Sequence, residues 1–348
     1  MTTITPTPQK PWRASKRERS FDFAILIGGF LASYLLVALT PMKGKLAYFA
    51  LFFISYALLT AVLKGLTRGS AAAKDALVSS LVVVGAVVTV IPIGSILLTV
   101  LQKGLPGISF GLFTHDMALA TPTDPLANGG LLHAITGTLT LVALALIMSV
   151  PIGILTALYL TEIKGRFTGP IRFLVQAMSG VPSIVAGLFI LSILVIPVTQ
   201  ELTGLMGSLA LSILMIPTIA RTAEEMLLLI PNELREAGVA LGATQWRTVS
   251  GVVVPAAKSG LVTAVILGIA RIIGETAPIL LVSGGADALN FNPMSGPMGS
   301  LPFYIWKAFL TGGTEEAYAR AWGGMLILLI LIVVLFGLAR HLSGRKVV

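Results

Sequence analysis

Eight apolar segments, each about as long as a membrane is thick, constrain this sequence more than any other feature. They lie at 21–40, 47–63, 77–101, 133–160, 173–198, 206–222, 259–282 and 323–340. A helix needs about 20 apolar residues to cross roughly 30 Å of hydrocarbon, whereas a lone strand would leave its backbone unsatisfied in lipid. The sequence therefore predicts an all-α integral membrane protein with about eight transmembrane helices.

The composition supports a membrane protein and argues against other classes. Only 11% of the 348 residues are charged and the mean hydropathy is +0.93, whereas soluble domains carry about 25% charged residues. The net charge of +9 does not indicate nucleic-acid binding, because the basic residues lie between apolar segments and form no stripe with aromatics. Cysteine is absent and the three histidines show no ligand spacing. We therefore predict no metal site and no cofactor.

The distribution of lysine and arginine predicts the orientation. With the basic N-terminal tail (1–20) in the cytoplasm, 18 of the 24 basic residues fall on the cytoplasmic side, five fall outside and Arg271 lies within a span. Cytoplasmic loops carry such an excess, so both termini are expected in the cytoplasm. The first apolar segment is longer than a signal-peptide core and lacks a cleavage pattern, and we interpret it as a retained span in contact with lipid.

Proline and glycine divide the chain into two parts. The first two apolar segments contain few of these residues and read as a plain hairpin at 21–76, whereas the spans within 77–348 are interrupted repeatedly. Two long outer connections are also rich in glycine and proline, and the second contains LPFYIWKAF, which suits a helix at the membrane interface. We therefore predict an extra hairpin placed before a functional core.

A polar segment at 231–258 is too hydrophilic to cross the membrane and too regular for a slack linker. Asn232 can cap a first short helix, Gly242 can end it in the left-handed conformation, and Thr244 can cap a second one. Apolar and small residues form one stripe along a face of the first helix: Leu234, Ala237, Gly238 and Leu241. Periodicity alone leaves open whether this stripe lies on lipid or receives another protein.

This segment resembles the EAA loop of ABC importer permeases. The residues in register with that pattern are Glu236, Ala237, Gly242, Val252, Val254 and Pro255, while Gly238 replaces the second alanine. The resemblance implies that the short helix, with Glu236, Ala237, Gly238 and Gly242, docks on a separate ATP-hydrolysing subunit. The chain contains no G-x-x-x-x-G-K-[ST] stretch to hold nucleotide phosphates, so we predict a transport subunit without catalytic residues of its own.

Arg271 and Glu275 are two charges within the seventh apolar segment. One such residue at the bilayer centre costs roughly 2.5–3.5 kcal/mol on insertion scales, so the pair needs compensation. One interpretation is an i, i+4 ion pair that joins this helix to its neighbours. The other is a polar path for an anion, because a guanidinium donates paired hydrogen bonds to phosphate or carboxylate.

Three further segments resemble the PstA family of phosphate importer permeases. They are IARIIGETAPILL, SGVPSIVAGLF and PMGSLPFYIW, and the likeness extends over roughly 77–340. It implies a type I ABC importer permease core in a bacterial inner membrane, with Arg271 and Glu275 in the phosphate path. It also implies three partners: a PstC-type second permease, ATPase subunits, expected as two copies, and a periplasmic or lipid-anchored phosphate-binding protein.

Alternatives remain open at this point. The chain could serve an importer of another oxyanion, such as sulfate or molybdate, or could be a secondary transporter, a channel or a membrane scaffold that needs no ATPase. Arg221, Glu224 and Glu225 read as a solvated helix end or as a gate. Acidic residues of the first outer connection, such as Asp116 and Asp124, read as ordinary surface groups.

Overall fold

The computed structural model describes residues 16–41, 43–121 and 123–342, and every regular element within these ranges is a helix. Seven of these helices, some with continuous extensions, are long and apolar enough to cross a membrane. A bent pair, Thr168–Ser179 with Ser183–Thr199, brings the number to eight if it counts as one span. The predicted class, an all-α membrane protein with about eight spans, is confirmed.

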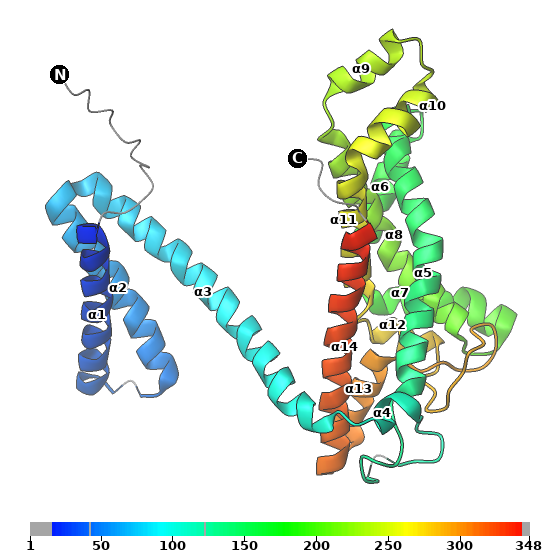
Figure 1. Cartoon of the computed structure of the whole chain (residues 1–348), viewed down its shortest axis with the longest axis horizontal. Helices are drawn as coiled ribbons and strands as arrows, with labels where there is room; N and C mark the ends of the chain where they lie inside the picture. Colours follow the sequence, from blue (N-terminus) through cyan, green and yellow to red (C-terminus); the bar gives the residue numbers. More distant parts are fainter. Residues whose placement is uncertain (1–15, 42, 122, 343–348) are drawn as a thin grey trace, which may run out of the picture. The chain divides into compact units, whose positions relative to one another are not determined.

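The chain divides into two compact units, of which the first ends at Leu97. It contains α1 (Lys16–Leu39), α2 (Lys45–Arg68) and most of α3 (Ser70–Gly104). α1 and α2 pack against each other (Figure 1, dark and mid blue). α1 begins within the stretch predicted as the tail 1–20, and residues 1–15 of that tail lie outside the described residues.

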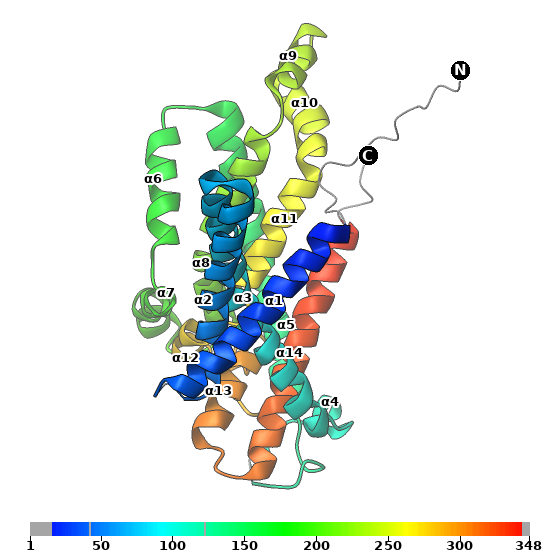
Figure 2. The ribbon, with the colours of Figure 1, turned by 90° about the vertical axis from the view of Figure 1, so that its left-hand side faces the viewer.

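The second unit runs from Leu98 to the C-terminus. Its elements are η1 (Leu105–Gly107), α4 (Gly111–Thr114), α5 (Leu132–Leu158), η2 (Tyr159–Ile163), α6 (Thr168–Ser179), α7 (Ser183–Ile190), η3 (Leu191–Thr199), α8 (Gly204–Leu228), α9 (Asn232–Ala240), α10 (Gln245–Thr248), η4 (Val249–Val253), α11 (Val254–Ile272), α12 (Ala277–Val282), α13 (Leu301–Thr311) and α14 (Glu315–Leu342). Figures 1 and 2 both show α9 and α10 at one end of this unit and α4 and α13 at the other. α14 runs between the two ends.

α8 forms the centre of the second unit and packs against both α5 and α11. Its Ile219 is fully buried between two glycines. A Cβ at Gly153 of α5 would lie 2.7 Å from Ile219, and one at Gly268 of α11 would lie 2.8 Å from it. Small residues allow helices to approach closely in a membrane, where packing rather than water exclusion drives association. The glycines that punctuate the sequence therefore build this core.

Two predicted spans are interrupted. The continuous helix expected at 173–198 is wrong, because the chain bends by 106° between α6 and α7. Gly180 follows the end of α6, and Pro182, which has no N–H to donate, precedes the start of α7. The segment predicted at 259–282 is divided into α11 and α12, with Gly274 within the break and Pro278 in the first turn of α12.

The two outer connections are joined by Asp116. Its carboxylate accepts one hydrogen bond from the N–H of Leu289 at 2.9 Å and another from the N–H of Ala118 at 3.1 Å. The bond from Leu289 is the main cause that lowers the pKa of Asp116 below its ordinary value. The interpretation of Asp116 as an ordinary surface group is therefore wrong, since it links segments 173 residues apart.

Arg320 holds the first outer connection from within α14. This arginine is fully buried. Its Nη2 donates to the backbone carbonyls of Asp124, Pro125 and Asn128 at 3.3, 3.1 and 3.0 Å. In the sequence Arg320 is one of the five basic residues on the outer side. In the structure it fixes the first outer connection to α14.

We expect Arg320→Met to lower the free energy of unfolding by about 1–3 kcal/mol, because the substitution removes the buried guanidinium that donates to three backbone carbonyls. Thermal unfolding in detergent measures the change. Arg340→Met, at an exposed position of the same helix, is the control and should leave the unfolding temperature unchanged. Equal stability of the two variants would contradict the role of Arg320.

Candidate functional site

The break between α11 and α12 contains the two charges that the sequence singled out. Arg271 lies in the last turn of α11 and Glu275 follows in the break, where its N–H donates to the carbonyl of Ile272 at 3.1 Å. The guanidinium donates through Nη1 to the carboxylate of Glu275, which confirms the i, i+4 ion pair. The Arg271 side chain is 42% exposed and that of Glu275 only 13%. The described chain therefore leaves the arginine accessible.

The break lies beside the other interrupted span. α12 packs against α7, and a Cβ at Gly187 would lie 2.8 Å from the Cα of Pro278. The segments SGVPSIVAGLF and IARIIGETAPILL, about 90 residues apart in the sequence, thus meet where both helices are discontinuous. Irregular backbone at membrane depth is tolerated only where it is covered by protein or lines a polar cavity. This junction is therefore a candidate place for a polar path.

The polar segment 231–258 begins with two short helices joined at a sharp turn. Gly242 has φ +82°, as predicted for a residue that ends a helix, and its N–H donates to the carbonyl of Val239 at 2.9 Å. Thr244 caps α10 by accepting from the N–H of Arg247 at 3.4 Å, which is also confirmed. The predicted cap by Asn232 is wrong, since Asn232 is already the first residue of α9 and no side chain caps that end.

The predicted stripe on α9 is divided between two surfaces. Gly238 is buried, and a Cβ there would lie 2.6 Å from Cγ2 of Thr248, so this glycine permits the close approach of α9 to α10. The other members of the stripe point outward and remain exposed, as do Glu236 and Gly242. Leu241 is 89% exposed and Trp246 of α10 is 68% exposed. Val239 and Leu234 are exposed as well, and we call these four exposed apolar side chains the apolar tip. Exposed apolar side chains in such number indicate a surface that binds another protein or lipid.

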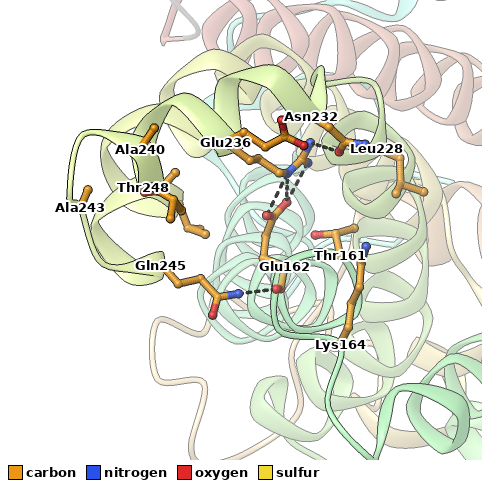
Figure 3. A pocket seen from close by; sticks show the side chains of 13 residues that line it. Thr161, Glu162, Lys164, Leu228, Asn232, Glu236, Ala240, Ala243, Gln245 and Thr248 are labelled. Atoms are coloured by element: carbon orange, nitrogen blue, oxygen red, sulfur yellow. Dashed lines mark hydrogen bonds and ion pairs between the residues drawn. The ribbon is translucent and has the colours of Figure 1, made fainter.

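The base of this segment holds an ion pair that sequence reasoning missed. Arg235 of α9 donates through Nη2 to Oε1 of Glu162 at 2.8 Å, and Glu162 belongs to η2 at the end of α5. The hydrogen bond to Glu162 raises the pKa of Arg235 above its ordinary value. A cavity of about 880 Å³ lies between this base and the two short helices (Figure 3). The partners are 73 residues apart, and no local pattern connects them.

The charges near the end of α8, Arg221, Glu224 and Glu225, separate into two kinds. Arg221 and Glu225 form an exposed pair at 3.5 Å, typical of a solvated helix end. Glu224 instead accepts from Arg172 of α6 at 2.7 Å and joins α6 to α8. Among the described residues no group of three or more His, Asp or Glu side chains is arranged to hold a metal ion.

Comparison with known proteins assigns the family. Residues 149–348 match the family described as binding-protein-dependent transport system inner membrane component. The phosphate transport system permease protein PstA of Mycobacterium leprae (strain TN) is 39% identical over 264 residues, which cover 74% of this chain and 86% of the relative. The chain belongs to the binding-protein-dependent transport permeases. Within that family it is a member of the PstA group.

A second relative supports this membership, and a solved structure shows the fold. The phosphate transport system permease protein PstA of Pasteurella multocida (strain Pm70) is 38% identical over 254 residues, covering 72% of this chain and 88% of the relative. A chain of the crystal structure of a bacterial ABC transporter involved in the import of the acidic polysaccharide alginate superposes with TM-score 0.57. That likeness covers 79% of this chain and 97% of the other at 16% identity, so it shows the fold alone.

Family membership fixes the general role of the chain. It is a multi-pass membrane permease component of an ABC transporter and not an ATPase. A permease of this family implies an ATP-hydrolysing partner and a binding protein. The ABC importer permease fold that the resemblance to the PstA family implied is thus confirmed.

We expect Gly238→Ala to destabilise the α9–α10 turn, because the added methyl group would overlap Thr248. Overpacking costs about 1–3 kcal/mol, whereas alanine for glycine in an unhindered helix gains about 1 kcal/mol. Limited proteolysis within 231–258 should therefore become faster. In the double variant with Thr248→Ala the methyl group has room, and cleavage should return to the rate of Thr248→Ala alone or below it. Slower cleavage in the single variant Gly238→Ala would refute the close contact.

Proposed function

We propose that the chain is the PstA-type permease subunit of an ATP-driven importer of inorganic phosphate. The identity to two PstA relatives supports the substrate class. The main structural support for a transport role is that Arg271 is accessible at the break of a membrane helix. The partners proposed are a PstC-type permease, two ATPase subunits and a periplasmic or lipid-anchored phosphate-binding protein.

The proposed anion path follows from the geometry of the Arg271–Glu275 pair. A guanidinium has a fixed fork of donors that matches two phosphate oxygens and stays charged at all relevant pH. Glu275 holds this fork when the path is empty, and an arriving phosphate competes with the carboxylate for it. Because the carboxylate repels the anion, phosphate does not remain trapped. Binding strong enough to enter and weak enough to leave is what transport requires.

The proposed coupling surface is the apolar tip of α9 and α10. Glu236, Ala237 and Gly242 are exposed beside it and are available to an ATPase, while Gly238 fixes the angle between the two helices. We assign this role to the loop 231–258 within a permease core at 77–348. The hairpin 21–76 is an addition to this core that serves either packing or anchoring in lipid.

The proposed orientation places α9 and α10 in the cytoplasm of a bacterial inner membrane. α14 ends toward the same end of the second unit (Figure 1), and that end carries the excess of basic residues. Both termini are then cytoplasmic. Uptake assays with labelled phosphate, sulfate and molybdate distinguish this importer from one for another oxyanion, and dependence on ATP distinguishes it from a secondary transporter or channel.

We predict that Arg271→Lys lowers phosphate uptake about tenfold or more, although the positive charge remains. A point ammonium lacks the fork, and a hydrogen bond to a charged group is worth about 1.5–3 kcal/mol. Labelled phosphate uptake into vesicles that contain the full transporter measures the loss. Arg340→Lys is the matched control at an exposed helix end. Uptake at the wild-type rate in Arg271→Lys would refute recognition by the guanidinium.

We also predict that Gly242→Val reduces the phosphate transported per ATP hydrolysed. A β-branched residue at φ +82° is strained by about 1–2 kcal/mol, so the end of α9 would shift. Gly242→Asn is the control, since asparagine tolerates this conformation, and it should retain coupling. If valine and asparagine give the same ratio as glycine, the turn at Gly242 has no part in coupling.

A further inference from the structure

Arg235 joins three helices through one guanidinium. Its Nε and Nη2 donate to both carboxylate oxygens of Glu162 at 2.8–3.2 Å. Nη1 donates to the carbonyl of Ile230 at 2.6 Å, and Nη2 donates to that of Leu227 at 2.9 Å. Leu227 lies in the last turn of α8, and Ile230 follows in the short connection between α8 and α9. Arg235 thus connects α9 to the ends of α5 and α8.

Glu162 receives a second contact from the other limb of the loop. Nε2 of Gln245, the first residue of α10, donates to the backbone carbonyl of Glu162 at 2.6 Å. One residue at the end of α5 therefore accepts hydrogen bonds from both α9 and α10, through its side chain and its main chain. Figure 3 shows the dashed line from Gln245 to Glu162 and others that end on the Glu162 carboxylate.

The two short helices of the loop pack mainly against the loop itself. α9 packs against α10 and η4, and the cavity of about 880 Å³ separates these helices from η2. Thr161, Glu162 and Lys164 line one side of this cavity. The polar side chains of Arg235 and Gln245 therefore bridge the gap to η2 in the described part of the chain. A displacement of α9 reaches α5 through these contacts.

The pair is well covered, so each partner depends on the other. The Glu162 side chain is 6% exposed and that of Arg235 is 21% exposed. Removal of one member of a covered pair leaves an uncompensated charge, which is more disruptive than the loss of an exposed pair. The bidentate geometry also fixes the direction of α9, because a guanidinium fork and a carboxylate align in one plane.

We propose that the Arg235–Glu162 pair is the contact that transmits movement of the docked loop to α5 and α8. This inference rests on the proposed function, in which an ATPase moves α9. Arg235 is a positioning residue: it meets neither phosphate nor nucleotide. When α9 is displaced, the guanidinium carries the end of α5 and the last carbonyls of α8 with it. The bundle then changes between its outward and inward states.

The test measures phosphate transported per ATP hydrolysed by the complete transporter in phospholipid vesicles. Arg235→Gln and Glu162→Gln should each lower this ratio about two- to thirtyfold, the range expected when a residue along a coupling network is changed, while ATP hydrolysis continues. The charge exchange Arg235→Glu with Glu162→Arg should restore part of the ratio. Full recovery is not expected, because the exchanged arginine no longer serves the carbonyls of α8.

The matched control is the other ion pair at the same end of the unit. Arg172 and Glu224 lie 2.7 Å apart and join α6 to α8. Arg172→Gln should leave the ratio at the wild-type value. If Arg235→Gln does not accumulate, the same ratio is measured in Glu162→Gln and Gln245→Ala. A lower ratio in these two variants supports the inference, and a wild-type ratio in both contradicts it.

Three results would overturn the inference. The ratio could stay at the wild-type value in Arg235→Gln and Glu162→Gln, or Arg172→Gln could lower it equally. The ATPase could also fail to co-purify with Arg235→Gln, which would make Arg235 a docking residue. A wild-type transporter that hydrolyses ATP and moves no phosphate would instead overturn the proposed function, and this inference with it.

A second readout uses the absence of cysteine from the chain. Spin labels at Ala240→Cys of α9 and Leu155→Cys of α5, both at exposed positions, report the separation of the two helices. In the wild-type background this separation should stay constant when ATP is added, because the helices move together. In the Arg235→Gln background it should change. A constant separation in both backgrounds would contradict transmission through Arg235.

Discussion

The absence of water from the hydrocarbon core is the constraint on which the structure depends. Every peptide group there must find a partner within the protein, so the chain crosses the membrane as helices. The same constraint applies to the two places where a span is interrupted, between α6 and α7 and between α11 and α12. α7 and α12 begin after such interruptions and pack directly against each other through Gly187 and Pro278. The two discontinuous spans are thereby brought together, while Arg271 at the second interruption stays exposed.

Much of this architecture could be predicted from the sequence because it is encoded locally. Length and hydropathy set the spans, and Gly242 and Thr244 mark the turn between α9 and α10 by their own backbone preferences. Arg271 and Glu275 were found because a charge inside an apolar run is costly wherever the helix packs. The ion pair between them follows from four-residue spacing on one helix.

The errors arise where distant parts of the chain decide the outcome. Asn232 has the right chemistry for a cap, but Arg235 draws its side-chain oxygen into a hydrogen bond at 3.3 Å. Arg320 and Asp116 look like surface charges in the sequence, but Arg320 is buried and Asp116 accepts a hydrogen bond from the second outer connection. The bend at Pro182 was missed because hydropathy stays high across it, and the period of apolar residues cannot register a change of direction. Arg235 and Glu162 have no sequence signal in common.

The buried Arg320 and the Asp116 link have a consequence for recognition at the outer surface. They hold the irregular connections in one arrangement before any partner arrives, so little conformational entropy remains to be lost when a protein lands there. Preorganised surfaces of this kind change little in backbone on complex formation. The glycine- and proline-rich outer segments, which composition alone would describe as slack, can therefore act as a rigid landing platform.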